Sequence, residues 1–270
     1  MLPRLIDTHC HLQSPRLAAD RAELVRRARE AGIEAGLIAA GAPGDWAECV
    51  GLAREHGWFA GLGVHPLATP ATPLSALGEL REALEAARGD PGSRVVAVAE
   101  IGIDGYEKSL DPALQEAFFS GQLKVARDFG LPVSVHARYA ADRVAKWLRR
   151  IEVPGGVIHA FNGSAEQAKV FLGLGFRLGF GGAMTYAGSK RIRRLAAELP
   201  LGALVLETDC PDMPSSARRD SGSVRTEPAD MASYLPELAR LRGMDEAELA
   251  AALRENAFAS FPKMRDFLAP

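Results

Sequence analysis

Histidines and acidic residues recur in this sequence at the ends of short apolar runs. The set comprises His9, His11, Glu100, His136, His159 and Asp209. Imidazole and carboxylate groups together suit borderline divalent cations such as Zn, Mn, Ni or Fe, and suit Mg less well because Mg prefers oxygen ligands. Ions of this kind, held with a position left for water, support hydrolysis. If the six side chains converge, the sequence predicts a centre that binds two divalent metal ions.

Each of these residues also has an ordinary structural interpretation. A single histidine such as His136 or His159 is more often a hydrogen-bonded core residue than a metal ligand. Glu100 is more informative, because a carboxylate in an apolar strand is costly to bury without a cation or strong donors beside it. His9 and His11 are two residues apart, so on a strand both project from one face. These four histidines, of six in the chain, all lie at the ends of such runs, and packing alone does not explain this placement.

The acidic residues are expected to differ in role. Glu100 can bridge two ions, which a single imidazole cannot do. Asp209 is the predicted general base, because that role needs a carboxylate that touches both a metal and the solvent side. Glu207 lies two residues earlier on the same face, and we expect it to orient a metal ligand without binding an ion itself. If Asp209 is not the base, Glu207 is the next candidate.

Three further side chains are candidates for substrate contacts. His65, at the end of the third run, fits a substrate or ligand-orienting role as readily as a helix-capping one. Arg138, two residues after His136, is a candidate phosphate clamp, with a salt bridge at the rim as the alternative. Arg225, in the loop after the eighth run, is a weaker candidate for the same task. By contrast, His56 lies at a predicted helix C-terminus, where an imidazole favours the helix dipole and needs no function.

Eight short runs rich in Val, Ile, Leu, Ala and Gly alternate with longer stretches of helical periodicity. The runs begin at Leu5, Glu34, Trp58, Val95, Pro132, Gly155, Arg177 and Ala203. This alternation is typical of repeated βα units around a parallel sheet. It predicts one α/β domain over residues 1–270, a single (β/α)8 TIM barrel with extra C-terminal helices near 228–241 and 245–267. A doubly wound open sheet is the alternative.

A barrel of this kind brings distant residues together. Its active-site residues lie at the C-terminal ends of the strands, which is where the candidate ligands occur. Closure also places the eighth strand beside the first, so Asp209 can approach His9 and His11 from the other end of the chain. The candidate ligands of the fourth, fifth and sixth strands lie on a neighbouring arc.

Charge and composition exclude several classes of protein. The 32 basic and 34 acidic residues give a formal net charge of −2, which excludes a globally basic surface that binds nucleic acid by its field alone. Three cysteines at unrelated spacings do not make a disulfide framework and fit a reducing compartment. No apolar run approaches the length of a membrane span, and no export signal is readable at the start. We therefore expect a cytoplasmic protein with no membrane or obligate protein partner.

Several motifs follow one another in a specific order along essentially the entire chain. They are DTHCH, GVHP, EIGID, LPVSVHAR, GVIHAFNGS and LETDCP, followed by RTEP. In this order they resemble the TatD-related metal-dependent hydrolases of the amidohydrolase superfamily. The resemblance implies a TIM barrel that acts on DNA or other phosphoester substrates. It also implies two ion sites, the first formed by His9, His11, Glu100 and Asp209 and the second by Glu100, His136 and His159.

The chain departs from the usual family pattern around the substrate. Family members often carry a second histidine after the GVHP proline, a tyrosine soon after the fourth-strand aspartate and Cys-Phe-Ser-Gly after the sixth-strand histidine. They also often carry tyrosine and asparagine in the loop after the eighth strand. The corresponding places here are Leu67, Gly105, residues 160–163, Asp212 and Thr226. Because the candidate ligands are all retained, metal-dependent hydrolysis is better supported than deoxyribonuclease activity.

The leading hypothesis is a divalent-metal-dependent phosphodiesterase or deoxyribonuclease, using Zn, Mn, Mg or Ni and a metal-activated water. We expect it to shorten a single strand from one end, because without an extended basic track only terminal nucleotides can be held. The few aromatic residues (4 Tyr, 3 Trp and 11 Phe) predict few stacking platforms and therefore weak, sequence-tolerant binding.

Two alternatives stay open. The first is a metal-dependent amidase, lactonase or deacylase of the same superfamily, which would bind the same ions but hydrolyse an amide or carboxylic ester bond in place of a phosphoester. Related barrels of that kind often bridge their ions with a carboxylated lysine, whereas no lysine here lies at the end of a predicted strand. A non-catalytic binding barrel would use the ions structurally, although structural sites are usually closed and rich in cysteine.

Overall fold

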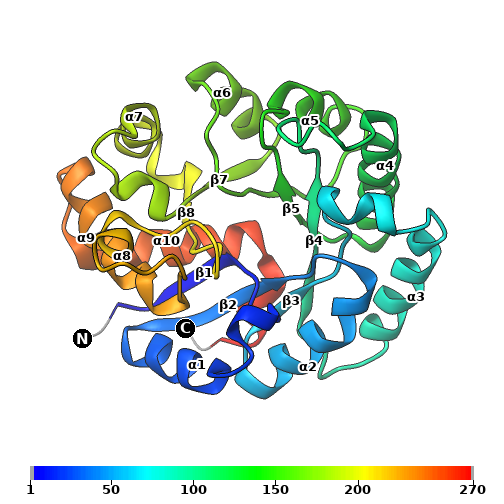
Figure 1. The fold of residues 1–270 in the computed structure, drawn as a ribbon, viewed down its shortest axis with the longest axis horizontal. Coiled ribbons are helices and arrows are strands. Elements are labelled where there is room, and N and C mark those ends of the chain that lie inside the picture. The colour runs from blue at the N-terminus through cyan, green and yellow to red at the C-terminus, as the bar shows by residue number, and fades with distance from the viewer. Residues whose placement is uncertain (1–2, 269–270) are drawn as a thin grey trace.

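Eight parallel strands form one sheet, in chain order, in a computed structural model that describes residues 3–268. The strands are β1 (Leu5–Cys10), β2 (Ile33–Ala39), β3 (Phe59–Gly61), β4 (Val95–Gly102), β5 (Val133–His136), β6 (Gly156–Ile158), β7 (Phe176–Phe180) and β8 (Leu204–Leu206). Figure 1 shows the strands surrounding a central axis, with the helices outside them. The predicted TIM barrel is confirmed, because every predicted run contains or overlaps one strand.

Helices cover the outer face of the barrel. They are α1 (Arg21–Glu30), α2 (Trp46–His56), α3 (Ala76–Arg88), α4 (Pro112–Phe129), α5 (Ala141–Leu148), α6 (Ala165–Gly173), α7 (Lys190–Glu198), α8 (Ser216–Asp220), α9 (Met231–Arg242) and α10 (Glu246–Ser260). The strands are consequently buried on both faces, which is why they read as continuous apolar runs. Within residues 3–268, we find no helix whose length and apolarity would let it cross a membrane.

The longest helix, α4, illustrates how local sequence sets the element boundaries. Its first turn is capped by the Asp111 side chain, which accepts a hydrogen bond from the backbone N–H of Ala113 at 2.8 Å. Pro112 occupies the first helical position, where its missing N–H costs nothing. Gly130 ends the helix with a φ of 62°, a left-handed conformation that glycine adopts without strain. These signals fix both ends of α4, which connects β4 to β5.

Hydrogen bonds between β1 and the segment around β8 close the barrel. The Thr8 hydroxyl donates to the carbonyl of Leu206 at 3.0 Å, and the N–H of Asp209 donates to the carbonyl of His9 at 2.9 Å. One step further, the N–H of His11 donates to the carbonyl of Cys210 at 2.8 Å. The first and last strands are therefore joined along one seam, as a closed barrel requires.

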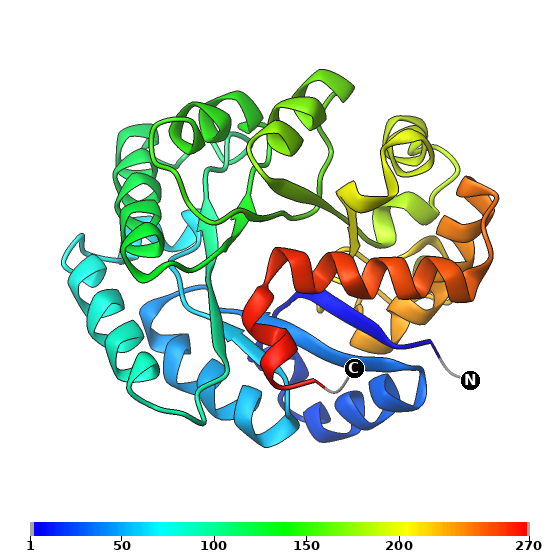
Figure 2. The same cartoon turned by 180° about the vertical axis from the view of Figure 1, so that it is seen from behind.

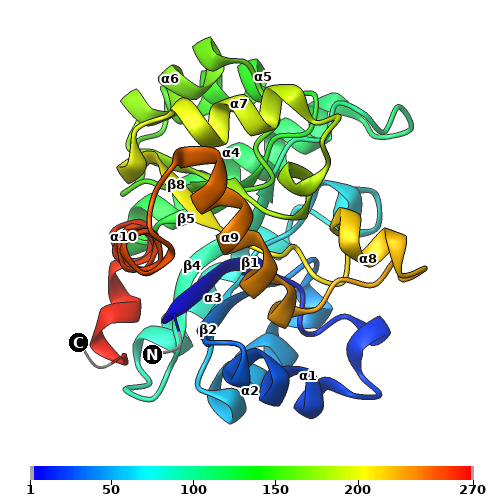
Figure 3. The same ribbon diagram turned by 90° about the vertical axis from the view of Figure 1, so that its left-hand side faces the viewer.

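The C-terminal helices differ in detail from the prediction. The stretch predicted as one helix over 245–267 is α10 followed by a short turn at Pro262–Asp266, because Pro262 cannot continue the helix. The polar stretch after β8 contains α8, which the sequence analysis did not predict. Figures 1 and 2 place α8 and α10 on opposite sides of the molecule, and Figure 3 shows them at opposite ends of the barrel.

The underside of the barrel is tied to α10 by a buried asparagine. The Asn256 side-chain amide donates to the carbonyls of Leu201 and Leu204, each at 2.8 Å. These two carbonyls precede and begin β8. The bonds therefore hold α10 against the start of the eighth strand, at the end of the barrel opposite to the ends of the strands that carry the candidate ligands.

Candidate active site

One buried carboxylate, that of Glu100 at the end of β4, lies at the centre of the site. Its side chain is 1% exposed. Imidazole nitrogens of five histidines lie within 3.3 Å of its oxygens: His159 (2.7 Å), His136 (3.1 Å), His9 (3.2 Å), His11 (3.3 Å) and His65 (3.3 Å). The structure thus brings together residues from β1, β4 and β5 and from the segments that follow β3 and β6.

Asp209 reaches the same cluster from the loop after β8. Its Oδ1 atom lies 3.3 Å from His11 Nε2 and 3.9 Å from His9 Nε2. The Asp209 backbone has a φ of 58°, a left-handed conformation that costs free energy for a residue with a side chain. The hydrogen bond from its N–H to the His9 carbonyl holds it there. All six candidate ligands consequently meet at one end of the barrel.

Hydrogen bonds fix the orientation of His9 in β1 and of His11 just after it. The Ser134 hydroxyl lies 2.7 Å from His9 Nδ1, and His11 Nδ1–H donates to the carbonyl of Ala39 at 2.8 Å. A neutral His11 ring therefore has a lone pair on Nε2, which faces the oxygens of Glu100 and Asp209 at 3.3 Å each. Three electron-rich atoms so close together are stable only with a cation or a proton among them.

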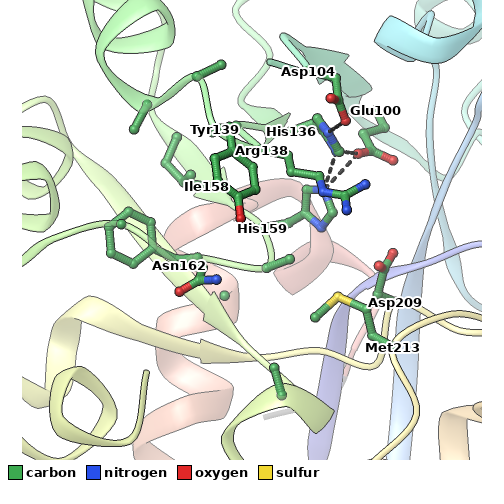
Figure 4. Close-up of a pocket in the computed structure, with 18 of the residues that line it drawn as sticks. Glu100, Asp104, His136, Arg138, Tyr139, Ile158, His159, Asn162, Asp209 and Met213 are labelled. Carbon is green, nitrogen blue, oxygen red and sulfur yellow. Dashed lines mark hydrogen bonds and ion pairs between the residues drawn. The ribbon is translucent and has the colours of Figure 1, made fainter. Parts of the chain in front are cut away.

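His136 is held by a carboxylate that the sequence analysis did not single out. Asp104 Oδ2 lies 2.9 Å from His136 Nε2, which leaves His136 Nδ1 directed at Glu100. Figure 4 shows Asp104, His136 and Glu100 in this arrangement, with His159 beside them. An acidic partner behind a metal-binding histidine sets its tautomer and raises its basicity. The signal for Asp104 was its position in EIGID, four residues after Glu100.

His65 is oriented differently from the other histidines. Its Nδ1 accepts a hydrogen bond from the backbone N–H of Leu67 at 3.1 Å, so a neutral ring carries its proton on Nε2. That nitrogen lies 3.3 Å from Glu100 Oε1. A protonated nitrogen donates hydrogen bonds and cannot bind an ion. The geometry therefore indicates that His65 is a hydrogen-bond donor beside the candidate metal ligands.

Burial and neighbouring charges compete at each of these groups. Burial opposes ionisation of Glu100, but the charges of His65, His159 and His9 outweigh it and hold the pKa of Glu100 well below its usual range. Burial likewise opposes the charge on His11, yet hydrogen bonds to Asp209 and Glu100 raise the pKa of His11 well above its usual value. The two carboxylates thus create a strongly negative centre that attracts positive charge.

Glu207 lies under the cluster rather than in it. Burial raises the pKa of Glu207 to about 8, and its Oε1 atom accepts the N–H of Ala160 at 2.5 Å and lies 3.9 Å from His159 Nδ1. Neither Glu207 Oε2 nor His159 Nδ1 has a hydrogen-bond partner among residues 3–268. Gly179 leaves room for this carboxyl group, because a Cβ at that position would lie 2.0 Å from Glu207 Oε2.

The donor set fits divalent ions. Three groups of ligand atoms in this cluster lie close enough to share an ion: His9 with His11 and Glu100, His9 with His159 and Asp209, and His65 with Glu100 and His136. Histidine nitrogens and carboxylate oxygens in this mixture suit Zn, Mn, Ni or Fe. Unlike the closed sites of structural zinc, the cluster borders a cavity of about 1300 Å³. It can therefore bind ions and a substrate together.

Of the two candidate phosphate-binding arginines, the structure brings only Arg138 to the cavity. Arg138 lines the cavity together with His136 and His159 (Figure 4). Arg225 is a correction: its guanidinium donates to both carboxylate oxygens of Asp20, at 2.9 and 2.7 Å, and to Glu227 at 3.1 Å. The cavity lining does not include it. Its charge is neutralised within an ion-pair network that attaches the loop after β8 to the start of α1.

Comparison with known proteins agrees with this geometry. The model of the TatD related DNase family matches residues 6–262. The uncharacterized metal-dependent hydrolase YjjV of Escherichia coli K12 is 35% identical and covers 97% of this chain and 99% of its own. Its crystal structure superposes with a TM-score of 0.90 over the same shares of the two chains. The 3′-5′ ssDNA/RNA exonuclease TatD of a Rahnella strain is 32% identical over 92% of this chain and 94% of its own.

These matches extend over nearly the whole barrel and include every strand end that contributes to the cluster around Glu100. The chain belongs to the TatD related DNase family and is a metal-dependent hydrolase.

Proposed function

We propose that this hydrolase is a phosphodiesterase that removes nucleotides from the 3′ end of single-stranded nucleic acid. The observation that carries the proposal is the cluster of histidines and carboxylates around Glu100, which opens into a cavity that also contains Arg138. The names of the relatives called 3′-5′ ssDNA/RNA exonucleases support both the substrate and the end that is attacked. A cavity at one end of a barrel suits a chain terminus better than an internal segment.

Two divalent ions are the proposed cofactors, because the cluster offers enough imidazole and carboxylate groups for two sites. His9, His11, Glu100 and Asp209 would hold the first, and Glu100, His136 and His159 would hold the second. When bound, such ions polarise a phosphate and lower the pKa of water. Zn, Mn, Ni and Fe match this ligand set better than Mg does.

The side chains of the site would then accept the proton of the water, hold the phosphate and orient the metal ligands. Asp209 accepts the proton of the attacking water at its carboxylate, since it lines the cavity, whereas Glu207 is buried behind the cluster. Arg138 and the Nε2–H of His65 donate to phosphate oxygens and so hold the scissile group. Asp104 keeps His136 in the tautomer that binds an ion.

A 5′-labelled single-stranded oligonucleotide tests this proposal. Incubated with the protein and Mn²⁺, Zn²⁺ or Mg²⁺, it should yield a ladder that shortens from the 3′ end and disappears when a chelator is added. Internal cuts would contradict the exonuclease assignment. Rapid hydrolysis of an acyl ester with no cleavage of the oligonucleotide would instead identify an amidase, lactonase or deacylase.

A further inference from the structure

Two tyrosine rings are exposed beside the catalytic cavity. Tyr139 is 81% exposed and Tyr106 is 54% exposed, and their ring centroids lie 5.6 Å apart. They follow β5 and β4, the strands that carry His136 and Glu100. Large aromatic side chains are costly to leave in water, so exposed rings next to a binding cavity indicate a surface for a flat ligand.

The two loops that carry these rings are locked together. The N–H of Gly105 donates to the carbonyl of Arg138 at 2.7 Å. A Cβ on Gly105 would lie 2.5 Å from the carbonyl oxygen of Tyr139, so only glycine permits this approach. Tyr139 itself has a φ of 51°, an unfavourable conformation for a bulky residue. The backbone that carries the two rings is therefore held by these contacts.

Asp104 connects this pair of rings to the candidate metal centre. One of its oxygens, Oδ1, accepts the backbone N–H groups of Tyr106 at 2.7 Å and Glu107 at 2.8 Å. The other oxygen lies 2.9 Å from His136 Nε2. A single carboxylate thus fixes both the loop that bears Tyr106 and the ring that faces Glu100.

A cation completes the arrangement. The guanidinium carbon of Arg138 lies 3.7 Å from the centre of the Tyr106 ring, a cation–π contact that keeps the arginine beside the rings. Arg138 and Tyr139 both line the cavity, and Tyr106 contacts both of them without belonging to the lining. Figure 4 shows Arg138 and Tyr139 on the cavity lining with His136 and His159. A nucleotide has a flat base that can stack on an aromatic ring and a phosphate that can bind a cation. The rings and Arg138, next to the hydrolytic centre, therefore suit a nucleotide as ligand.

We propose that Tyr139 and Tyr106 stack the base of a terminal nucleotide while Arg138 holds its phosphate. We call these three residues the stacking platform. The inference rests on the proposed nuclease function and adds how the substrate is recognised. Tyr139 follows His136 by three residues, about 10 Å of extended chain at most, so the stacked base belongs to a nucleotide at or next to the scissile phosphate. Every base has a π face, so recognition is insensitive to sequence.

The existence of this platform changes one expectation from composition. The chain has few aromatic residues, and this predicted few stacking surfaces and weak binding. Of the four tyrosines, Tyr139 nevertheless lines the cavity and Tyr106 packs beside it. Composition gives the number of aromatic residues in a chain but not their location.

A fluorescent base reports stacking directly. The probe is a short single strand with 2-aminopurine at its 3′ terminus and a phosphorothioate at the terminal linkage, which slows cleavage. Binding to the wild-type protein should quench the fluorescence. The Tyr139→Leu variant should bind about 5-fold to 150-fold more weakly and lose most of the quenching, the range expected for one lost stacked base. Tyr139→Phe keeps the ring and should retain most of both signals.

Controls separate this inference from the function on which it rests. Val224→Ala removes another exposed apolar side chain that does not line the cavity, and it should leave binding unchanged. Wild-type protein should also show a higher KM, with a similar kcat, for an oligonucleotide whose terminal nucleotide lacks a base. This comparison needs no variant and therefore holds even if Tyr139→Leu folds poorly.

Two outcomes would overturn different claims. If the wild-type protein shortens oligonucleotides but Tyr139→Leu binds and quenches the probe like wild type, the stacking platform is wrong and the nuclease function stands. If the wild-type protein cleaves no oligonucleotide under any metal while hydrolysing an acyl ester, the proposed function is wrong, and the inference falls with it.

Discussion

Asp209 and Glu207 are two residues apart on the same stretch of chain, yet their surroundings differ. Asp209 borders the cavity beside His11, whereas Glu207 is enclosed beneath His159. Burial raises the pKa of Glu207 to about 8, while the hydrogen bond from His11 and the charges of nearby histidines outweigh burial and lower the pKa of Asp209. The two carboxyl groups should therefore respond differently to conversion into an amide.

We expect Asp209→Asn to leave the fold intact and to reduce kcat by about 10²-fold to 10⁴-fold, because an amide cannot accept the proton of water. Saturating metal should not restore the activity. Glu207→Gln should mainly weaken metal affinity, and added metal should restore most of the activity. Steady-state kinetics over a metal titration distinguish the two. Near-wild-type turnover by Asp209→Asn at saturating metal would exclude Asp209 as the base.

Asp104→Asn tests the carboxylate behind His136. The amide keeps one oxygen for the backbone N–H groups of Tyr106 and Glu107, but its NH₂ group would face the His136 Nε2–H and repel it. We expect a loss of about 10-fold to 100-fold in metal affinity. Competition with a chromophoric chelator measures this affinity without relying on turnover. Asp128→Asn, an exposed site on α4, is the matched control. Equal affinities in Asp104→Asn and wild type would contradict the assigned role.

At the scale of elements, α10 supports the barrel from the end opposite to the cavity. Asn256→Ala would remove the two hydrogen bonds from the side-chain amide to the carbonyls of Leu201 and Leu204, at a cost of about 0.5 to 1.5 kcal/mol each. We expect a lower urea midpoint with metal affinity little changed. Glu255→Ala, at the exposed neighbouring position of α10, should have a much smaller effect. An unchanged midpoint for Asn256→Ala would contradict the role given to this contact.

The strands were predictable from sequence, whereas the contacts between their loops were not. A strand buried on both faces is a continuous apolar run, so β4 and its Glu100 are visible without a structure. The approach of Gly105 to Tyr139 depends on how two neighbouring strands end in space, and no periodicity records it. The ion pair of Arg225 was unpredictable for the same reason, because its partner Asp20 lies at the other end of the chain. The strands and their ligands were therefore predictable, whereas the contacts between loops required the structure.

At the scale of the whole molecule, a formal net charge of −2 and a binding cavity confined to one end of the barrel imply that few phosphates are contacted at once. We expect KM to be nearly the same for single strands of 5 and 30 nucleotides, since only the terminal nucleotides are held. The affinity should also depend weakly on salt. A plot of the logarithm of the binding constant against the logarithm of the salt concentration should have a slope near −0.7 for each phosphate bound. Affinity measurements over a series of strand lengths and salt concentrations test this. A KM that falls steadily with length would indicate an additional binding track.

The seam between β1 and β8 also has a consequence for the timing of activity. His9 and His11 lie at the end of the first strand and are synthesised well before Asp209, which follows the last strand. A chain still attached to the ribosome therefore has only part of its ligand set until the eighth strand is released and docks beside the first. Assembly of the complete ligand set is thus a late event in the synthesis of this barrel.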